Sequence, residues 1–177
     1  MSDIPQLYMR HPDITKLPPL CLPSGFCLYN HTEGVDEPIW EALVKRAFNN
    51  TFSFEACIVN GGFYKPERVL YLKYNGKTIA TATAVERSDF PGEGWFRMIA
   101  TDPDSRGLGA GRLICLAALH SLAARGYKTA ALSTDDDRIP ALCLYLSLGF
   151  EPIYTHESHK ERWEKVMNEI SKIKKRV

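Results

Sequence analysis

The spacing of hydrophobic positions divides the chain into helical and extended segments. After Asp36-Glu37-Pro38, apolar residues recur at the helical period, at Ile39, Trp40, Leu43, Val44, Ala47 and Phe48. Residues 69–74 and 78–85 instead alternate β-forming residues around Asn75-Gly76, a strong hairpin signal. Further strands are expected at residues 26–29, 95–101, 127–134 and 150–154. Strands and helices therefore alternate along most of the chain.

Three further helices are predicted. One runs from about Gly111 to Arg125 and is apolar around most of its circumference, as expected for a helix pressed against a sheet. A short helix follows Arg138 and ends at Gly149. The last begins at the capping box Ser158-x-x-Glu161 and carries an apolar stripe of Trp163, Val166, Met167 and Ile170.

The distribution of proline and of regular pattern suggests three parts. Residues 1–25 contain five prolines and are expected to form an extended arm with little regular structure. Residues 26–155 form the folded domain, and residues 156–177 form a C-terminal amphipathic helix with a basic tail. Within the domain, residues 49–68 show no clear pattern, and residues 88–94 are expected to form a proline-glycine loop.

Composition narrows the class of protein. The 177 residues include 22 lysines and arginines and 21 aspartates and glutamates, so no overall field favours nucleic acid or an anionic membrane. No stretch has the apolar length of a membrane span, and the start of the chain lacks a signal-peptide profile. We therefore expect a soluble cytoplasmic protein. The five cysteines show no Cys-x-x-Cys spacing, and His156 and His159 lack nearby ligands, so no metal site is predicted.

The most informative segment is residues 98–112, which reads as a strand, a glycine-rich loop and the start of a helix. The loop glycines are Gly107, Gly109 and Gly111. Backbone N–H groups at such a helix start point one way, and the helix dipole adds positive potential, which suits a phosphate or diphosphate. A P-loop is excluded because no Lys-Ser/Thr pair follows Gly111, and the spacing does not fit the Gly-x-Gly-x-x-Gly dinucleotide fingerprint.

A second motif lies about forty residues further on. Pro140 suits a first helical turn, with Asp136 and Asp137 as candidate caps. Gly149 suits the left-handed position after the helix, with Phe150 as its apolar partner. Between them the short helix carries a tyrosine, Tyr145, on an otherwise apolar body.

Together these motifs resemble those of the GNAT acetyltransferases. The loop matches their Arg-x-x-Gly-x-Gly pattern from Arg106 to Gly111, and Ala141-x-x-x-Tyr145-x-x-x-Gly149-Phe150 matches their Tyr-bearing helix. The resemblance covers about residues 26–154. It implies an α/β (α+β) domain of the GNAT acyl-CoA N-acyltransferase fold, a central mixed, mostly antiparallel sheet flanked by helices, here with an extra C-terminal helix.

The chain departs from the family pattern at two places. Arg138 stands where the family often has Asn, which puts in doubt a role of this position in holding the pantetheine arm. A C-terminal helix is predicted where the family normally places the strand of a final hairpin. That seventh strand is therefore either absent or comes from elsewhere.

The resemblance also implies a reaction, direct transfer from acetyl-CoA in a ternary complex, with no metal. It places the diphosphate on Arg106, Gly107, Leu108, Gly109, Ala110, Gly111 and Arg112. The pantetheine arm would pair with backbone groups at Ile99, Ala100 and Thr101. Tyr145 is the candidate general acid for the departing thiolate.

The acceptor and the general base stay open. The resemblance implies a primary amine of a small molecule or peptide, bound by residues 49–68 and 86–95. Glu86, Asp89 and Glu93 are candidate bases, although the pattern favours a solvated loop or strand-edge charge for each of them. The alternatives are a coenzyme A-binding regulatory or interaction module without turnover, and an aminoacyl- or thiol-directed acyltransferase. The apolar stripe of the C-terminal helix leaves a homodimer open.

Overall fold

Seven strands form one mixed sheet in the computed structural model, which describes residues 4–62, 64–87 and 90–174. Their spatial order is β2 (Phe26–Asn30), β3 (Val69–Tyr74), β4 (Lys77–Arg87), β5 (Phe90–Thr101), β6 (Ala130–Thr134), β1 (Leu7–His11) and β7 (Glu151–Ile153). Neighbouring strands are antiparallel except β5 and β6, which run parallel. The predicted fold class, a mostly antiparallel mixed sheet flanked by helices, is confirmed.

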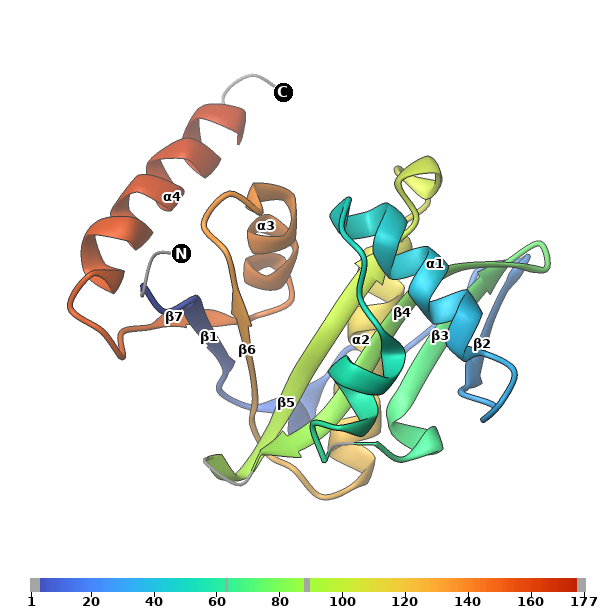
Figure 1. Ribbon diagram of the computed structural model, residues 1–177. Helices are drawn as coiled ribbons and strands as arrows, with labels where there is room; N and C mark the ends of the chain where they lie inside the picture. The colour runs from blue at the N-terminus through green and yellow to red at the C-terminus, as the bar shows by residue number, and fades with distance from the viewer. Residues whose placement is uncertain (1–3, 63, 88–89, 175–177) are drawn as a thin grey trace.

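Two helices cover opposite faces of this sheet (Figure 1). They are α1 (Glu37–Phe48) and α2 (Ala110–Ala124). In β3, Val69 and Tyr71 pack with α1, whereas Leu70 and Leu72 belong to the core around α2. Since side chains alternate between the faces of a strand, α1 and α2 lie on opposite faces. The predicted helices and the hairpin at Asn75-Gly76 are present, and both turn residues have positive φ.

The segment that precedes the family-like domain contributes a strand. The sequence predicted little regular structure in residues 1–25, but β1 lies between β6 and β7 and pairs antiparallel with both. Leu7 and Met9, two positions apart, are fully buried there. Its partners are far away in the chain, as in the pairing of Met9 with Leu132 and Pro152. The missing strand is therefore supplied by the N-terminal segment.

Other differences concern strand limits and the region without a pattern. The predicted loop at residues 88–94 is strand from Phe90 onward, and Asp89 lies outside the described residues. β6 begins at Ala130 rather than 127, and the residues between it and the left-handed Gly126 after α2 are not strand. Residues 49–68 contain one π-helical turn, Glu55–Val59, and a 3-10 turn, Pro66–Arg68.

Two helices lie near the half of the sheet formed by β6, β1 and β7. The short helix α3 (Ile139–Ser147) packs against α4 (His159–Lys174), and Figure 1 shows both at this end of the molecule. The stripe of Trp163, Val166 and Ile170 is buried, whereas Met167 is largely exposed. The predicted extra C-terminal helix is therefore confirmed. Across the described ranges, no helix combines the length and the apolar character needed to cross a membrane.

Candidate active site

The glycine-rich loop has the backbone shape of an anion-binding turn. Gly107 and Gly109 have φ values of 82° and 75°, a left-handed conformation that favours glycine, and there is open space where their side chains would be. The first helical hydrogen bond of α2 is from Leu113 N–H to the Gly109 carbonyl, at 3.1 Å. The N–H groups at residues 110–112 precede this bond and have no helical acceptor. They provide donors for an anion at a helix N-terminus.

Gly111 fixes where this loop sits in the fold. A Cβ on Gly111 would lie 3.1 Å from Leu144 Cδ2 and 3.7 Å from Thr101 Cγ2. Its missing side chain therefore allows the start of α2 to approach α3 and the end of β5. The three elements that the sequence motifs singled out meet at this point.

A buried carboxylate supports the entry to the loop. Asp102, 2% exposed, is bonded by Lys77 at 2.7 Å and by Arg46 at 2.8 Å, and it accepts a hydrogen bond from the Asp104 N–H at 3.1 Å. Burial by itself would raise the pKa of Asp102, but these partners lower it to about 2. Sequence reasoning did not find this residue, because its cations come from α1 and the β3–β4 hairpin.

The β5 strand contains a bulge close to its end. Thr81 pairs with Ala100 and Thr83 pairs with Arg97, so the pairing advances two residues on β4 and three on β5. Met98 lies within this irregularity with a φ of 50°, a rare conformation for a residue other than glycine. Such conformations cost energy and persist only where the surrounding structure enforces them. The bulge redirects the backbone at the place where the sequence predicted contact with the pantetheine arm.

The two central strands part beside the bulge. Only Gly94 and Trp95 of β5 pair with β6, at Ala130 and Ala131. Further along, Arg97, Ala100 and Thr101 pair with β4, and in the described part of the chain no residue of 97–101 pairs with β6. The backbone groups on the other side of β5 are therefore available to an extended ligand. This parting includes the predicted positions 99–101.

Tyr145 lies on α3, in the core next to this parting. It is 7% exposed, and its ring centroid lies 5.9 Å from that of Phe150. Gly149 has a φ of 94°, and the Phe150 N–H donates to the Tyr145 carbonyl at 3.0 Å, which ends the helix as predicted. Burial raises the pKa of Tyr145, and so does the Cys115 thiol, whereas the charge of Arg138 acts in the opposite direction. The phenol is therefore protonated at neutral pH, as a general acid must be.

The N-terminal end of α3 differs from the prediction. Arg138 occupies the cap position without a side-chain capping bond, and Asp136 binds Arg162 instead of capping the helix. The Arg138 guanidinium lies 4.2 Å from the ring centroid of Phe48 at the end of α1 and 3.4 Å from Asp135. This arginine therefore bridges α1 and the loop before α3.

The described carboxylates that were candidate bases have partners. Both carboxylate oxygens of Glu93 accept hydrogen bonds from Arg10, from Nε at 2.5 Å and from Nη2 at 3.1 Å. Only 8% of the Glu93 side chain is exposed. Glu86 accepts hydrogen bonds from the Tyr127 hydroxyl and, at 3.4 Å, from Arg68. Both carboxylates therefore take part in ion pairs or hydrogen bonds within the fold.

A polar group buried among aromatic rings lies under α1, beside the region without a sequence pattern. His31 is 4% exposed and stacks on Phe54 at 4.6 Å, and its Nδ1 lies 3.0 Å from the Tyr71 hydroxyl. Arg97, one residue before the bulge, donates to the Cys57 carbonyl at 3.0 Å and so connects β5 to the π-helical turn. No sequence signal marked this cluster, because its members are scattered from residue 31 to residue 97.

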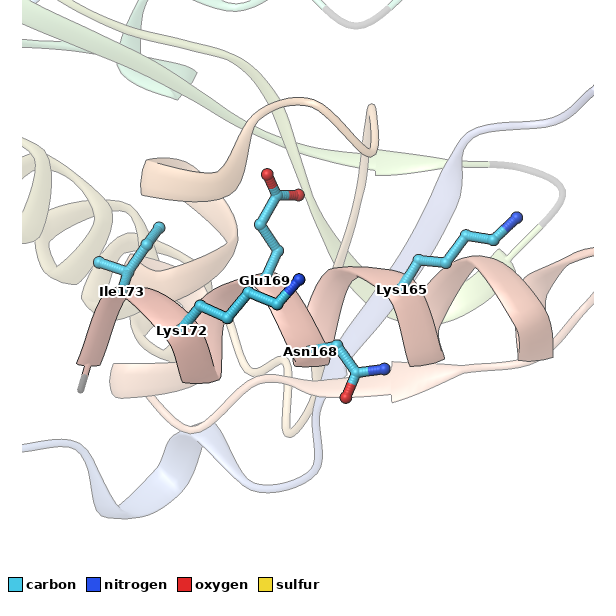
Figure 2. Close-up of a pocket in the computed structure, with 5 residues that line it drawn as sticks. All are labelled: Lys165, Asn168, Glu169, Lys172 and Ile173. Atoms are coloured by element: carbon cyan, nitrogen blue, oxygen red, sulfur yellow. The ribbon is translucent and has the colours of Figure 1, made fainter. Parts of the chain in front are cut away.

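The remaining candidates lie apart from the loop. Figure 2 shows a surface hollow on α4 lined by Lys165, Asn168, Glu169, Lys172 and Ile173, all from one helix. The His156 and His159 rings are 5.8 Å apart, and the described residues contain no group of three or more His, Cys, Asp or Glu side chains suited to a metal. The loop, the end of β5 and α3 therefore remain the candidate site.

The comparisons identify the family to which this fold and candidate site belong. The chain belongs to the acetyltransferase (GNAT) family, whose model matches residues 32–150. A mycothiol acetyltransferase of Thermobispora bispora is 35% identical over 155 residues, which cover 80% of this chain and 52% of that protein. One of Thermomonospora curvata is 30% identical over 152 residues, covering 81% and 50%. The chain spans about half the length of these curated relatives.

Solved structures agree with the fold. The ribosomal-protein-S18-alanine N-acetyltransferase of Escherichia coli is 27% identical with a TM-score of 0.60, covering 73% of this chain and 79% of that one. The strands β1, β2 and β7 and the helix α4 lie outside the residues matched by the family model.

Proposed function

We propose that this chain transfers the acetyl group of acetyl-CoA to a primary amine of a small molecule or peptide, by direct attack in a ternary complex. The observation that carries this proposal is the set of free N–H groups at residues 110–112 beside the parted strands and Tyr145. The relatives' names support an acetyl donor, and the name of the Escherichia coli structure supports an amine acceptor. We assign the transferase domain to residues 26–155, with the N-terminal segment completing its sheet.

The loop suits the diphosphate of the donor. The N–H groups of residues 107–112 and the dipole of α2 provide donors and positive potential. Arg106 and Arg112 can add charge-assisted hydrogen bonds. The amide groups of the pantetheine arm would pair with the exposed edge of β5 at Ile99, Ala100 and Thr101, as an added strand does. The acyl group would then lie near the bulge at Met98 and face Tyr145.

The transfer itself needs few protein groups. The amine nitrogen attacks the thioester carbon, and a backbone N–H near the bulge would stabilise the developing oxyanion. The carbon–sulfur bond then breaks, and Tyr145 gives its proton to the departing thiolate, which leaves free coenzyme A. The attacking nitrogen loses its proton to water, and the Tyr145 phenolate takes a proton back from water, so that the balance closes. An amine that arrives neutral needs no dedicated base, which is consistent with the partners of Glu86 and Glu93.

Two measurements on the same preparation test this function. Calorimetry with coenzyme A and with pantetheine, which lacks the diphosphate, tests the loop. We expect only coenzyme A to bind tightly. Release of free thiol from acetyl-CoA is then followed across a panel of small amines and peptide N-termini. Thiol release with at least one amine supports the proposal. Binding without thiol release would indicate a coenzyme A-binding module, and no binding at the loop would overturn the assignment altogether.

A further inference from the structure

The loop between β6 and α3 is held by segments that the family model does not include. Asp136 in this loop accepts two hydrogen bonds from Arg162 of α4, from Nη2 at 2.5 Å and from Nε at 2.8 Å. Its neighbour Asp135 accepts one from Gln6 Nε2 at 2.9 Å. Both donors lie outside the matched residues 32–150. The anchorage of the loop therefore depends on parts of the chain that surround the family core.

Arg162 joins three segments with one guanidinium. Besides Asp136, its Nη1 donates to the Pro5 carbonyl at 2.7 Å, just before β1, and reaches Ser158 Oγ at 3.4 Å. Only 18% of its side chain is exposed. The planar fork of arginine can satisfy a carboxylate with two bonds and still bind a carbonyl, which lysine cannot do. This residue thus fixes the N-terminal segment, α4 and the loop relative to one another.

The position of α3 depends on this loop. Arg138, the cap residue of α3, makes no side-chain capping bond, so the start of the helix is held by the loop residues before it, by the contact of Arg138 with Phe48 and by core packing. Tyr145 lies two turns along α3 and is buried. A shift of the loop would therefore move the Tyr145 hydroxyl relative to the edge of β5.

We propose that Arg162 is a positioning residue for the acetyl transfer, which it serves by holding the loop before α3 through Asp136. The inference rests on the proposed function and deepens it. The diphosphate-binding N–H groups belong to another element, α2, so Arg162 should affect the transfer step more than donor binding. We expect Arg162→Ala to lower kcat by about 10–100-fold, because misplacement by about 1 Å costs that much. The KM for acetyl-CoA should stay within about three-fold.

The experiment uses the full chain and compares five variants with the wild type, namely four single substitutions and the double variant Arg162→Ala/Asp136→Ala. Arg162→Ala removes the guanidinium that binds Asp136 and the Pro5 carbonyl. Arg162→Lys keeps the positive charge without the planar guanidinium. Asp136→Ala removes the carboxylate partner of Arg162 in the loop. The matched control is Lys165→Ala, one turn along α4 and labelled in Figure 2, whose exposed ion pair with Glu161 is local. Each variant is measured for kcat, for KM and for amide hydrogen exchange of residues 135–145, with α2 as the internal reference.

The proposal predicts that Arg162→Ala and Asp136→Ala lose kcat to the same extent, that their combination loses little more, and that both speed exchange in residues 135–145. Arg162→Lys should recover part of the loss, and Lys165→Ala should match the wild type. A kcat of Arg162→Ala equal to that of Lys165→Ala, unchanged exchange, or a rise in KM alone would overturn it. A wild type without turnover would overturn the proposed function instead, while exchange would still decide whether Arg162 holds the loop.

Discussion

Gly111 lies so close to Leu144 that a Cβ on the glycine would be 3.1 Å from Leu144 Cδ2. The contact joins the first turn of α2 to α3, and so links the candidate diphosphate site to the helix that carries Tyr145. φ at Gly111 is not in the left-handed region, so the requirement for glycine here is one of space. This distinguishes Gly111 from Gly107 and Gly109, whose requirement is conformational.

The first prediction uses this difference. Gly111→Ala should push the start of α2 away from α3, and this overpacking should lower the free energy of unfolding by about 1–3 kcal/mol. The displaced loop should then bind coenzyme A more weakly. Calorimetry with coenzyme A measures the effect. The double variant with Leu144→Ala creates the missing space and should recover much of the affinity. If the double variant binds no better than Gly111→Ala, the close contact is not the reason for the glycine.

The second prediction concerns the phenol. Tyr145→Phe keeps the ring in its contact with Phe150 and removes only the hydroxyl. If this hydroxyl protonates the departing thiolate, kcat should fall by about 100–10,000-fold with nearly unchanged coenzyme A affinity. Tyr154→Phe is the control, because Tyr154 is 62% exposed. Equal turnover in Tyr145→Phe and wild type would dismiss the role of general acid.

The parts of the fold that the sequence predicted correctly have local signals. The hairpin depends on Asn75 and Gly76, both left-handed in the structure, and the end of α3 depends on Gly149. The same holds for the glycine loop, since its shape is determined by neighbouring residues. Periodicity over twelve residues was sufficient for α1.

The parts that were missed depend on distant partners. Leu7 and Met9 form a strand because β6 and β7 lie on either side of them, more than 100 residues along the chain. Asp102 is a buried ion-pair centre only because Arg46 and Lys77 reach it from other elements. The six residues between Pro5 and Pro12 contain too few positions for the alternation of a strand to be recognised. The sequence therefore predicted the glycine loop and the helices around it, but not the N-terminal strand or the ion pairs between distant segments.

The third prediction follows from the pKa of Asp102. Because its folded pKa, about 2, is below its ordinary value of 3.8, the carboxylate stabilises the fold above pH 4. That stabilisation is lost as the pH falls from about 4 to 2. A pKa shift of this size corresponds to about 2 kcal/mol in the free energy of unfolding. The contribution should be smaller in salt, because the side chains of Arg46 and Lys77 are 49% and 62% exposed.

Asp102→Asn should therefore lower the free energy of unfolding by about 2 kcal/mol at pH 7, and the difference from wild type should narrow towards pH 2. Urea unfolding at several pH values measures it. Asp104→Asn, at a carboxylate with 73% of its side chain exposed, is the control and should have little effect. A difference that stays constant with pH would show that the charge of Asp102 is not what stabilises the loop entry.

The last prediction tests whether the N-terminal strand is an integral part of the fold. Met9 is fully buried between β6 and β7, whereas Met167 on α4 is 44% exposed. Met9→Ala should lower the free energy of unfolding by about 2–5 kcal/mol, the usual range for truncating a buried large side chain, and Met167→Ala by much less. Denaturant unfolding with a single shared transition would show that β1 unfolds with the rest of the sheet. If Met9→Ala were as stable as Met167→Ala, or if β1 detached in a separate transition, the N-terminal segment would be an accessory arm and not an integral strand of the sheet.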